Sequence, residues 1–164
     1  MSSHGLHHYL RRLLELTDYE VDCRDCDGLT ALFHAARKGH LKTVELLLER
    51  GAEVDSKDKN GRTPLSFAAK AYGSFETVKL LLERGAEVDS KNKNGRTPLS
   101  FAANEYGSLE TVQLLLERGA EIDWKDKDGR TPLSYATLND NTKIVALILE
   151  RGADQVPKCI RMIS

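Results

Sequence analysis

The feature that constrains this chain most is an internal repeat with a period of 33 or 34 residues. Residues 60–91 and 94–125 are nearly identical along their whole length. The repeat is marked by two series of glycines, one before each threonine and one after each apolar segment: Gly28, Gly61, Gly95 and Gly129, and Gly51, Gly85, Gly119 and Gly152. Together the two series place one additional residue in each middle repeat. A chain of this kind is predicted to form a stack of similar units.

Each unit is predicted to fold as two antiparallel helices. Thr63 is suited to cap a helix that begins at Pro64, because threonine accepts a backbone N–H and proline lacks the donor that would stay unpaired there. Ser74 is placed to cap a second helix, whose apolar residues recur at helical spacing until Gly85. Residues 86–95 are mostly polar and favour an extended connection. Because one helix pair cannot cover its own apolar stripe, neighbouring pairs must stack.

The motifs Asp-x-x-Gly-x-Thr-Pro-Leu, Ala-Ala and Leu-Leu-Leu-Glu-Arg-Gly-Ala-Glu-Val-Asp resemble the ankyrin repeat over residues 25–156, and similar arrays are frequent in fungal proteins. The resemblance implies an all-α solenoid of stacked antiparallel helix pairs with extended, β-turn-like connections. We expect one ankyrin-repeat domain over residues 1–164. Its expected parts are a half-repeat cap (1–24), four repeats (25–57, 58–91, 92–125 and 126–156) and a C-terminal tail (157–164).

The chain departs from the ankyrin pattern after each Thr-Pro-Leu. The family usually has a histidine there, and its side chain ties adjacent loops together. This chain has Ser66, Ser100 and Ser134 instead. A serine hydroxyl replaces only part of the bonding capacity of an imidazole, so we expect some of the hydrogen bonds between repeats to be lost.

Charge and composition exclude several classes of protein. Twenty-four Lys and Arg residues face twenty-five Asp and Glu residues, and the net charge of -1 creates no overall attraction to nucleic acid or to an anionic membrane. No apolar run is long enough to span a bilayer, and the N-terminus lacks the pattern of a secretory signal. Three cysteines without a repeated spacing fit a reducing compartment. We expect an intracellular protein of the cytoplasm or the nucleus.

The sequence contains none of the common catalytic or phosphate-binding motifs. Cys23 and Cys26 form a single Cys-x-x-Cys pair without a second pair of ligands, and His4 and His8 lie four residues apart without a third ligand. His34 falls inside the first repeat, where a structural hydrogen bond is the simpler interpretation. We therefore expect no metal, no cofactor and no enzyme activity.

The resemblance places a partner-binding groove along the tips of the connections and the surface ends of the first helices. The basic residues of the tips recur one repeat apart, roughly 10 Å, and they are Lys59, Arg62, Lys93, Arg96, Lys127 and Arg130. Such a row is suited to acidic side chains or phosphates, with the arginines forming bidentate hydrogen bonds. The alternative is that Asp58, Asp126 and Asp128 neutralise the row.

Five further residues complete the candidate binding surface: Lys70, Tyr72, Glu105, Tyr106 and Trp124. The two tyrosines lie in the expanded segments of the middle repeats, and we expect them to contact a partner, because aromatic side chains with a polar group are favoured as binding anchors. Trp124 replaces a serine of the earlier repeats. It either contacts a partner or braces its turn.

The last predicted helix, which includes Ile144 to Leu149, is unusually apolar for a terminal repeat. A terminal repeat normally presents a polar outer face. We therefore expect this helix to be covered by the tail (157–164), by a partner or by further chain.

The sequence thus favours a protein–protein interaction module that binds a partner with an acidic patch along the concave groove, with no role for nucleic acid or membrane. Two alternatives stay open. One is an enzyme or small-ligand binder that uses the same groove, and the other is a fragment or subunit that assembles through its apolar C-terminal helix. The oligomeric state is left open.

Overall fold

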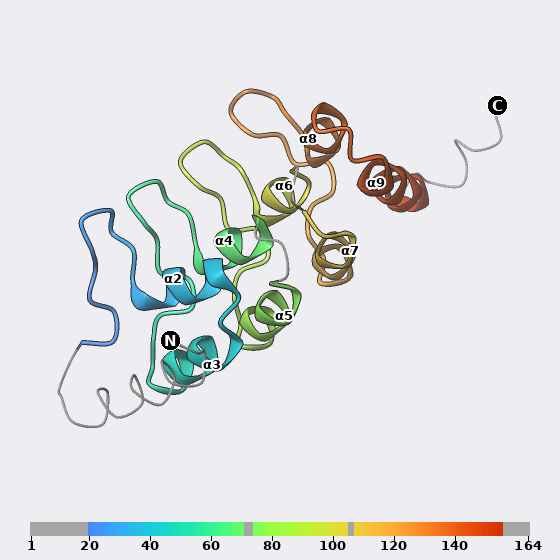
Figure 1. The fold of residues 1–164 in the computed structure, drawn as a ribbon. Coiled ribbons are helices and arrows are strands. Elements are labelled where there is room, and N and C mark those ends of the chain that lie inside the picture. The colour runs from blue at the N-terminus through green and yellow to red at the C-terminus, as the bar shows by residue number, and fades with distance from the viewer. Residues whose placement is uncertain (1–19, 71–73, 105–106, 156–164) are drawn as a thin grey trace, which may run out of the picture.

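The computed structural model describes residues 20–70, 74–104 and 107–155 (Figure 1). This part of the chain consists of helices and loops, without a strand among the described residues. The helices are α2 (Ala31–Lys38), α3 (Leu41–Glu49), α4 (Pro64–Lys70), α5 (Phe75–Glu83), α6 (Pro98–Ala102), α7 (Leu109–Glu117), α8 (Pro132–Leu138) and α9 (Thr142–Gln155).

The helices are arranged in two layers (Figure 1). Helices α2, α4, α6 and α8 form the first layer, helices α3, α5, α7 and α9 form the second, and the long connecting loops project beyond the first layer. Each helix packs against its partner in the same repeat and against the equivalent helix of at least one neighbouring repeat. The predicted all-α solenoid of stacked helix pairs is confirmed.

The first helices begin as their Thr-Pro sequences predict. The Oγ1 atoms of Thr97 and Thr131 accept the backbone N–H groups of Ser100 and Ser134, at 3.3 and 3.2 Å. The Oγ of Ser100 also lies 3.2 Å from the Oγ1 of Thr97. The serine in the histidine position therefore bonds within its own repeat and contributes to the start of its helix.

The capping of the second helices is less uniform than predicted. The Oγ of Ser108 accepts the backbone N–H of Thr111 at 3.1 Å. Ser74 also precedes its helix, but its side chain makes no capping hydrogen bond, so that detail of the prediction is wrong. The cause is the backbone: Ser74 has a ψ of 18°, whereas Ser108 is extended with a ψ of 137°, the conformation that N-cap residues normally have.

The core is a series of equivalent residues supplied by every repeat. Leu65, Leu81, Leu99 and Leu115 are fully buried, and the small residues of the first helices, such as Ala69, are buried where these helices approach one another. Burial of a leucine stabilises the fold by about 1.5–3 kcal/mol. Since the same positions are buried in successive repeats, each helix pair depends on its neighbours for cover.

Backbone hydrogen bonds between neighbouring tips supply part of the inter-repeat bonding that the serines do not. In each pair a lysine N–H donates to the carbonyl oxygen of the preceding tip. The distances are 3.3 Å from Lys59 to Asp27, 2.8 Å from Lys93 to Asn60 and 3.0 Å from Lys127 to Asn94. Neighbouring tips are thus joined to one another through the main chain.

Aspartates at the exits of the second helices form a second series of bonds between repeats. The carboxylate of Asp55 accepts the backbone N–H of Glu87 at 3.0 Å. The same bond joins Asp22 to Glu53 at 3.0 Å and Asp89 to Glu121 at 3.1 Å. The stack is therefore tied along two lines, one at the tips and one at the exits.

Candidate partner-binding surface

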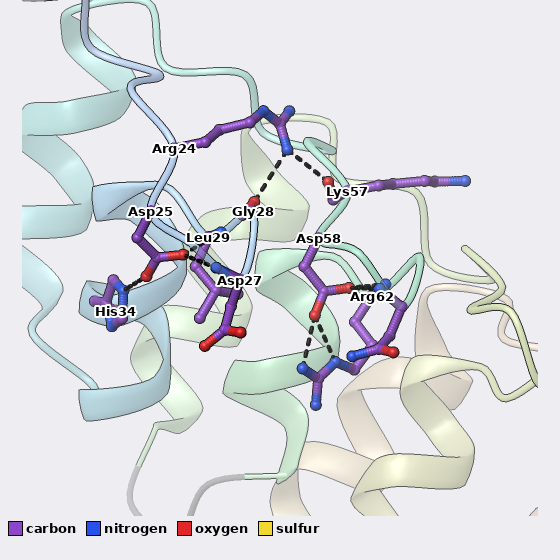
Figure 2. Close-up of polar contacts among 10 residues, drawn as sticks. Arg24, Asp25, Asp27, Gly28, Leu29, His34, Lys57, Asp58 and Arg62 are labelled. Carbon is purple, nitrogen blue, oxygen red and sulfur yellow. Dashed lines mark hydrogen bonds and ion pairs between the residues drawn. The ribbon is translucent and has the colours of Figure 1, made fainter.

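The tips are held in shape by acidic or amide side chains at their base. The Oδ1 of Asp58 accepts the backbone N–H groups of Asn60 and Arg62, at 2.9 and 2.7 Å (Figure 2). Asn92 and Asp126 hold the next two tips in the same way. Asp58 and Asp126 are 6% and 7% exposed. These two carboxylates are therefore part of the scaffold and lie below the exposed face of the tips.

Asp126 stays ionised although it is buried. Burial opposes its charge, but hydrogen bonds from the Tyr135 hydroxyl and from the backbone N–H groups of Arg130 and Asp128 outweigh that cost and lower its pKa. The pKa of Tyr135 is raised, first by its own burial and then by its bond to this carboxylate. The pair joins the base of the fourth tip to helix α8.

The first tip differs from the others because His34 stands at the first-helix position where the later repeats have Phe67, Phe101 and Tyr135. The Nε2 of His34 lies 2.9 Å from Oδ2 of Asp25, as Figure 2 shows. Oδ1 of Asp25 accepts the backbone N–H groups of Leu29 and Asp27, both at 2.9 Å. The bond from Leu29, followed by that from His34, lowers the pKa of Asp25. The structural hydrogen bond predicted for His34 is confirmed.

Two of the three tip arginines fold back on the first helices. The guanidinium of Arg62 is paired with Oδ2 of Asp58 at 2.6 Å and lies 4.4 Å from the centre of the Phe67 ring. The guanidinium of Arg96 lies between the rings of Phe101 and Tyr135, at 4.4 and 4.2 Å. Both arginines are half-buried, whereas Arg130 is exposed. Stacking on aromatic rings stabilises the tip and leaves fewer N–H donors of Arg62 and Arg96 free for a partner.

Most of the exposed positive charge of the tips belongs to lysines. Each of the last three tips has two of them, and all six are exposed: Lys57, Lys59, Lys91, Lys93, Lys125 and Lys127. None of the six ammonium groups forms an ion pair within the described part of the chain. Lys59, Lys93 and Lys127 were among the candidates taken from the sequence. The other three were missed, although their one-repeat spacing was visible.

Trp124 braces the tips of the third and fourth repeats. Its Nε1–H donates to the carbonyl oxygen of Gly95 at 2.8 Å. The ammonium of Lys91 lies 3.3 Å from the centre of the ring, and the side chain is half-buried. Of the two roles left open by the sequence, the structural one is thus present, and one face of the ring is covered by Lys91.

The remaining candidates divide into one described residue and three that are not. Lys70 is exposed at the end of α4. Tyr72, Glu105 and Tyr106 lie outside the described residues. A hollow in the described part of the chain is lined by Phe75 and by residues at the starts of the second helices of repeats three and four, among them Ser108, Leu109 and Lys143.

The edge of the stack at the exit turns carries the opposite charge. Glu53, Glu87 and Glu121 are exposed there. Partial burial, together with repulsion by Glu87, raises the pKa of Asp55 in spite of the backbone hydrogen bond from Glu87. The pKa of Asp89 is raised in the same way, with Glu121 in the place of Glu87. The exit turns therefore present acidic side chains where the tips present lysines.

The described residues were also searched for chemistry and for membrane-spanning helices. Within these ranges, no three His, Cys, Asp or Glu side chains are grouped so that they could hold a metal ion. None of the described helices has the length and the apolar character needed to cross a membrane.

Comparison with known proteins identifies the repeat. The family described as ankyrin repeats (3 copies) matches residues 1–92 and 72–159. B-cell lymphoma 3 protein of Homo sapiens is 48% identical over 52 residues, which are 31% of this chain and 12% of that protein. Serine/threonine-protein kinase 12 of Arabidopsis thaliana is 52% identical over 56 residues, 33% of this chain and 12% of that protein. Cortactin-binding protein 2 of Rattus norvegicus is 46% identical over 52 residues, which are 30% of this chain and 3% of that protein.

These matches cover only a small part of each relative, so they concern the repeats and not the whole proteins. The family match, in contrast, spans nearly the whole chain. Repeats of this family are protein-interaction modules and are generally not enzymatic. By its sequence and by its stacked helix pairs, this chain belongs to the ankyrin repeat family.

Proposed function

We propose that this chain binds an extended acidic segment of a partner protein along the tips of its second, third and fourth repeats. The observation that carries the proposal is the row of six exposed lysines on three tips that are bonded to one another through their backbones. A partner segment that crosses the tips would meet a pair of cations in each repeat. Several weak contacts on one rigid support then act together.

The scaffold below the row favours this function, because it keeps the lysines at fixed positions. Asp58, Asn92 and Asp126 fix the turns, and Arg62 and Arg96 lock the tips onto the aromatic rings of the first helices. The residues that the sequence marked as cationic contacts thus have two roles. The half-buried arginines position the tips, and the lysines and Arg130 face the partner.

A protein partner fits this charge pattern better than a polyanion such as nucleic acid. The net charge of the chain is -1, and the exit turns carry exposed glutamates. The basic surface is therefore narrow, and the one indole ring near it is half-buried under Lys91. Nucleic-acid surfaces usually combine broader positive charge with exposed aromatic rings.

The proposal is tested by charge reversal on a partner captured from the native cell. Lys59→Glu, Lys93→Glu and Lys127→Glu are combined in one variant. The matched control combines Lys42→Glu, Lys79→Glu and Lys143→Glu, which change the net charge equally but lie on the second helices. Each exposed charge pair contributes about 0.2–1 kcal/mol, so the tip variant should bind about tenfold more weakly or worse.

Binding of the captured partner is measured by biolayer interferometry at two salt concentrations. We expect the tip variant to lose affinity and most of the salt dependence, while the control retains both. Equal losses in the two variants would show a general charge effect. Unchanged binding by the tip variant would remove the tip row from the binding surface.

A further inference from the structure

The fourth repeat exposes positions that are buried in every other repeat. Four first-helix positions are at most 2% exposed in the first three repeats: Thr30, Leu32, Phe33 and Ala36; Thr63, Leu65, Ser66 and Ala69; Thr97, Leu99, Ser100 and Ala103. Their equivalents Thr131, Leu133 and Ser134 are only partly buried, and Thr137 is exposed. Within the described residues, the fourth repeat alone has no repeat after it. In the first three repeats, these four positions are therefore covered by the repeat that follows.

The exposed positions form a groove on α8. It is lined by Thr131, Leu133, Ser134, Thr137 and Leu138. Leu138 is 67% exposed, and Leu149 of the neighbouring α9 is 54% exposed. The expected apolar face of the terminal repeat is thus present, and it includes the first helix as well as the second.

The backbone of the fourth tip repeats the same open geometry. A Cβ on Gly61 would lie 3.1 Å from the backbone nitrogen of Lys93 in the next tip, whereas a Cβ on Gly129 would meet nothing within 4 Å. The carbonyl oxygen of Asp128 is equivalent to the acceptors of the tip series, and it has no hydrogen-bond partner among the described residues.

The first repeat has the matching edge. Ala31 is exposed, although Pro64, Pro98 and Pro132 at the equivalent position are buried. Pro132 is buried even in the last repeat, so this position is covered from the N-terminal side. The backbone N–H of Cys26 is equivalent to the donors of the tip series and has no acceptor among the described residues.

We propose that copies of this chain associate head to tail, with the first repeat of one copy seated in the α8 groove of the next. The contact would continue the packing that already joins successive repeats three times within the chain, donor against acceptor and first helix against first helix. The exposed aspartates of the first tip, Asp25 and Asp27, would then lie next to the exposed Lys127 and Arg130 of the fourth.

Such a contact joins two different surfaces, so it does not close on itself and adds further copies. It uses the ends of the stack and not the tip row, so it is independent of the proposed partner binding. A contact between two α8 grooves would instead be symmetric and would stop at a dimer.

The experiment is sedimentation velocity of the full chain over a range of concentrations, with two blocking variants. Thr137→Arg places a large cation at an exposed position that the next copy would bury. Ala31→Arg does the same on the opposite edge. The matched control is Ala146→Arg, at a position of the second helix whose equivalents Lys79 and Gln113 are exposed inside the stack. Circular dichroism checks that each variant keeps its helix content.

We expect the native chain and Ala146→Arg to shift to species larger than a dimer as concentration rises. Thr137→Arg and Ala31→Arg should each stay monomeric, and their equimolar mixture should form a dimer, because each retains one intact edge. The inference is overturned if the native chain is monomeric throughout, if Ala31→Arg still forms dimers alone, or if the mixture does not associate.

Discussion

Gly61→Ala measures how much the contact between neighbouring tips stabilises the stack. Gly61 has a φ of +73°, and a left-handed conformation costs an ordinary residue roughly 1–2 kcal/mol. Alanine also restricts the unfolded chain more than glycine does, which restores about 0.4–1 kcal/mol of stability. In addition, the new Cβ would lie 3.1 Å from the Lys93 nitrogen, which donates to Asn60 at 2.8 Å. Weakening that bond costs about 1 kcal/mol, so the total loss is about 2 kcal/mol.

Gly129→Ala is the matched control, because Gly129 has a φ of +75° and open space around its Cα. It should lose only the conformational part, about 1 kcal/mol. Urea unfolding is followed by circular dichroism and by the fluorescence of Trp124, the single tryptophan of the chain. If the two alanine variants lose the same stability, the tip contacts do not contribute and the reasoning is refuted.

Three further substitutions test the electrostatics and the turns. Burial raises the pKa of Asp55, so the ionisation of its carboxyl opposes folding above that pKa. Asp55→Asn should therefore raise stability to urea at pH 7. A gain in stability that persists below about pH 3 would contradict this reasoning. Tyr135→Phe removes the donor that lowers the pKa of Asp126 and should cost about 1.5 kcal/mol at neutral pH. Its thermal unfolding should differ less from the native chain as pH falls through that lowered pKa, and a constant difference would refute the role. Asp140, with a φ of 51°, takes the turn position that Gly39 takes in the first repeat. Asp140→Gly should therefore raise the free energy of unfolding by about 0.5 kcal/mol. Urea unfolding measures it, and a loss of stability would contradict the reasoning.

The helix pairs were predictable because their signals are local and repeated four times. A Thr-Pro start, present in three of the four repeats, an apolar stripe and a glycine after that stripe each act within a few residues. The prediction was weaker where equivalent residues of two repeats differ in backbone conformation. Ser74 and Ser108 look alike in sequence, but their backbone conformations differ, and only Ser108 caps its helix.

The candidate surface was less predictable because it depends on contacts one repeat away. The sequence places Arg62 and Arg96 in a row with the lysines, but it does not show that aromatic rings of the first helices hold their guanidinium groups. It left the role of Trp124 open, since the acceptor of its indole lies on the preceding tip. Neutralisation of the row by acidic residues was left open by the sequence, and the structure shows it at Arg62, which pairs with the buried carboxylate of Asp58 at 2.6 Å.

The hydrogen bonds between repeats were also hard to predict from the sequence. The serines in the histidine positions bond within their own repeats, as their small side chains allow. The bonds between tips come from backbone N–H and carbonyl groups, which every residue has and which no sequence motif marks.

Hydrogen–deuterium exchange of the captured complex tests the central claim most directly. The claim is that the partner lies across the tips of the last three repeats. We predict slower exchange on binding at residues 57–62, 91–96 and 125–130, with little change in α3, α5 and α7. Protection limited to the second helices, with the tips unchanged, would contradict the account.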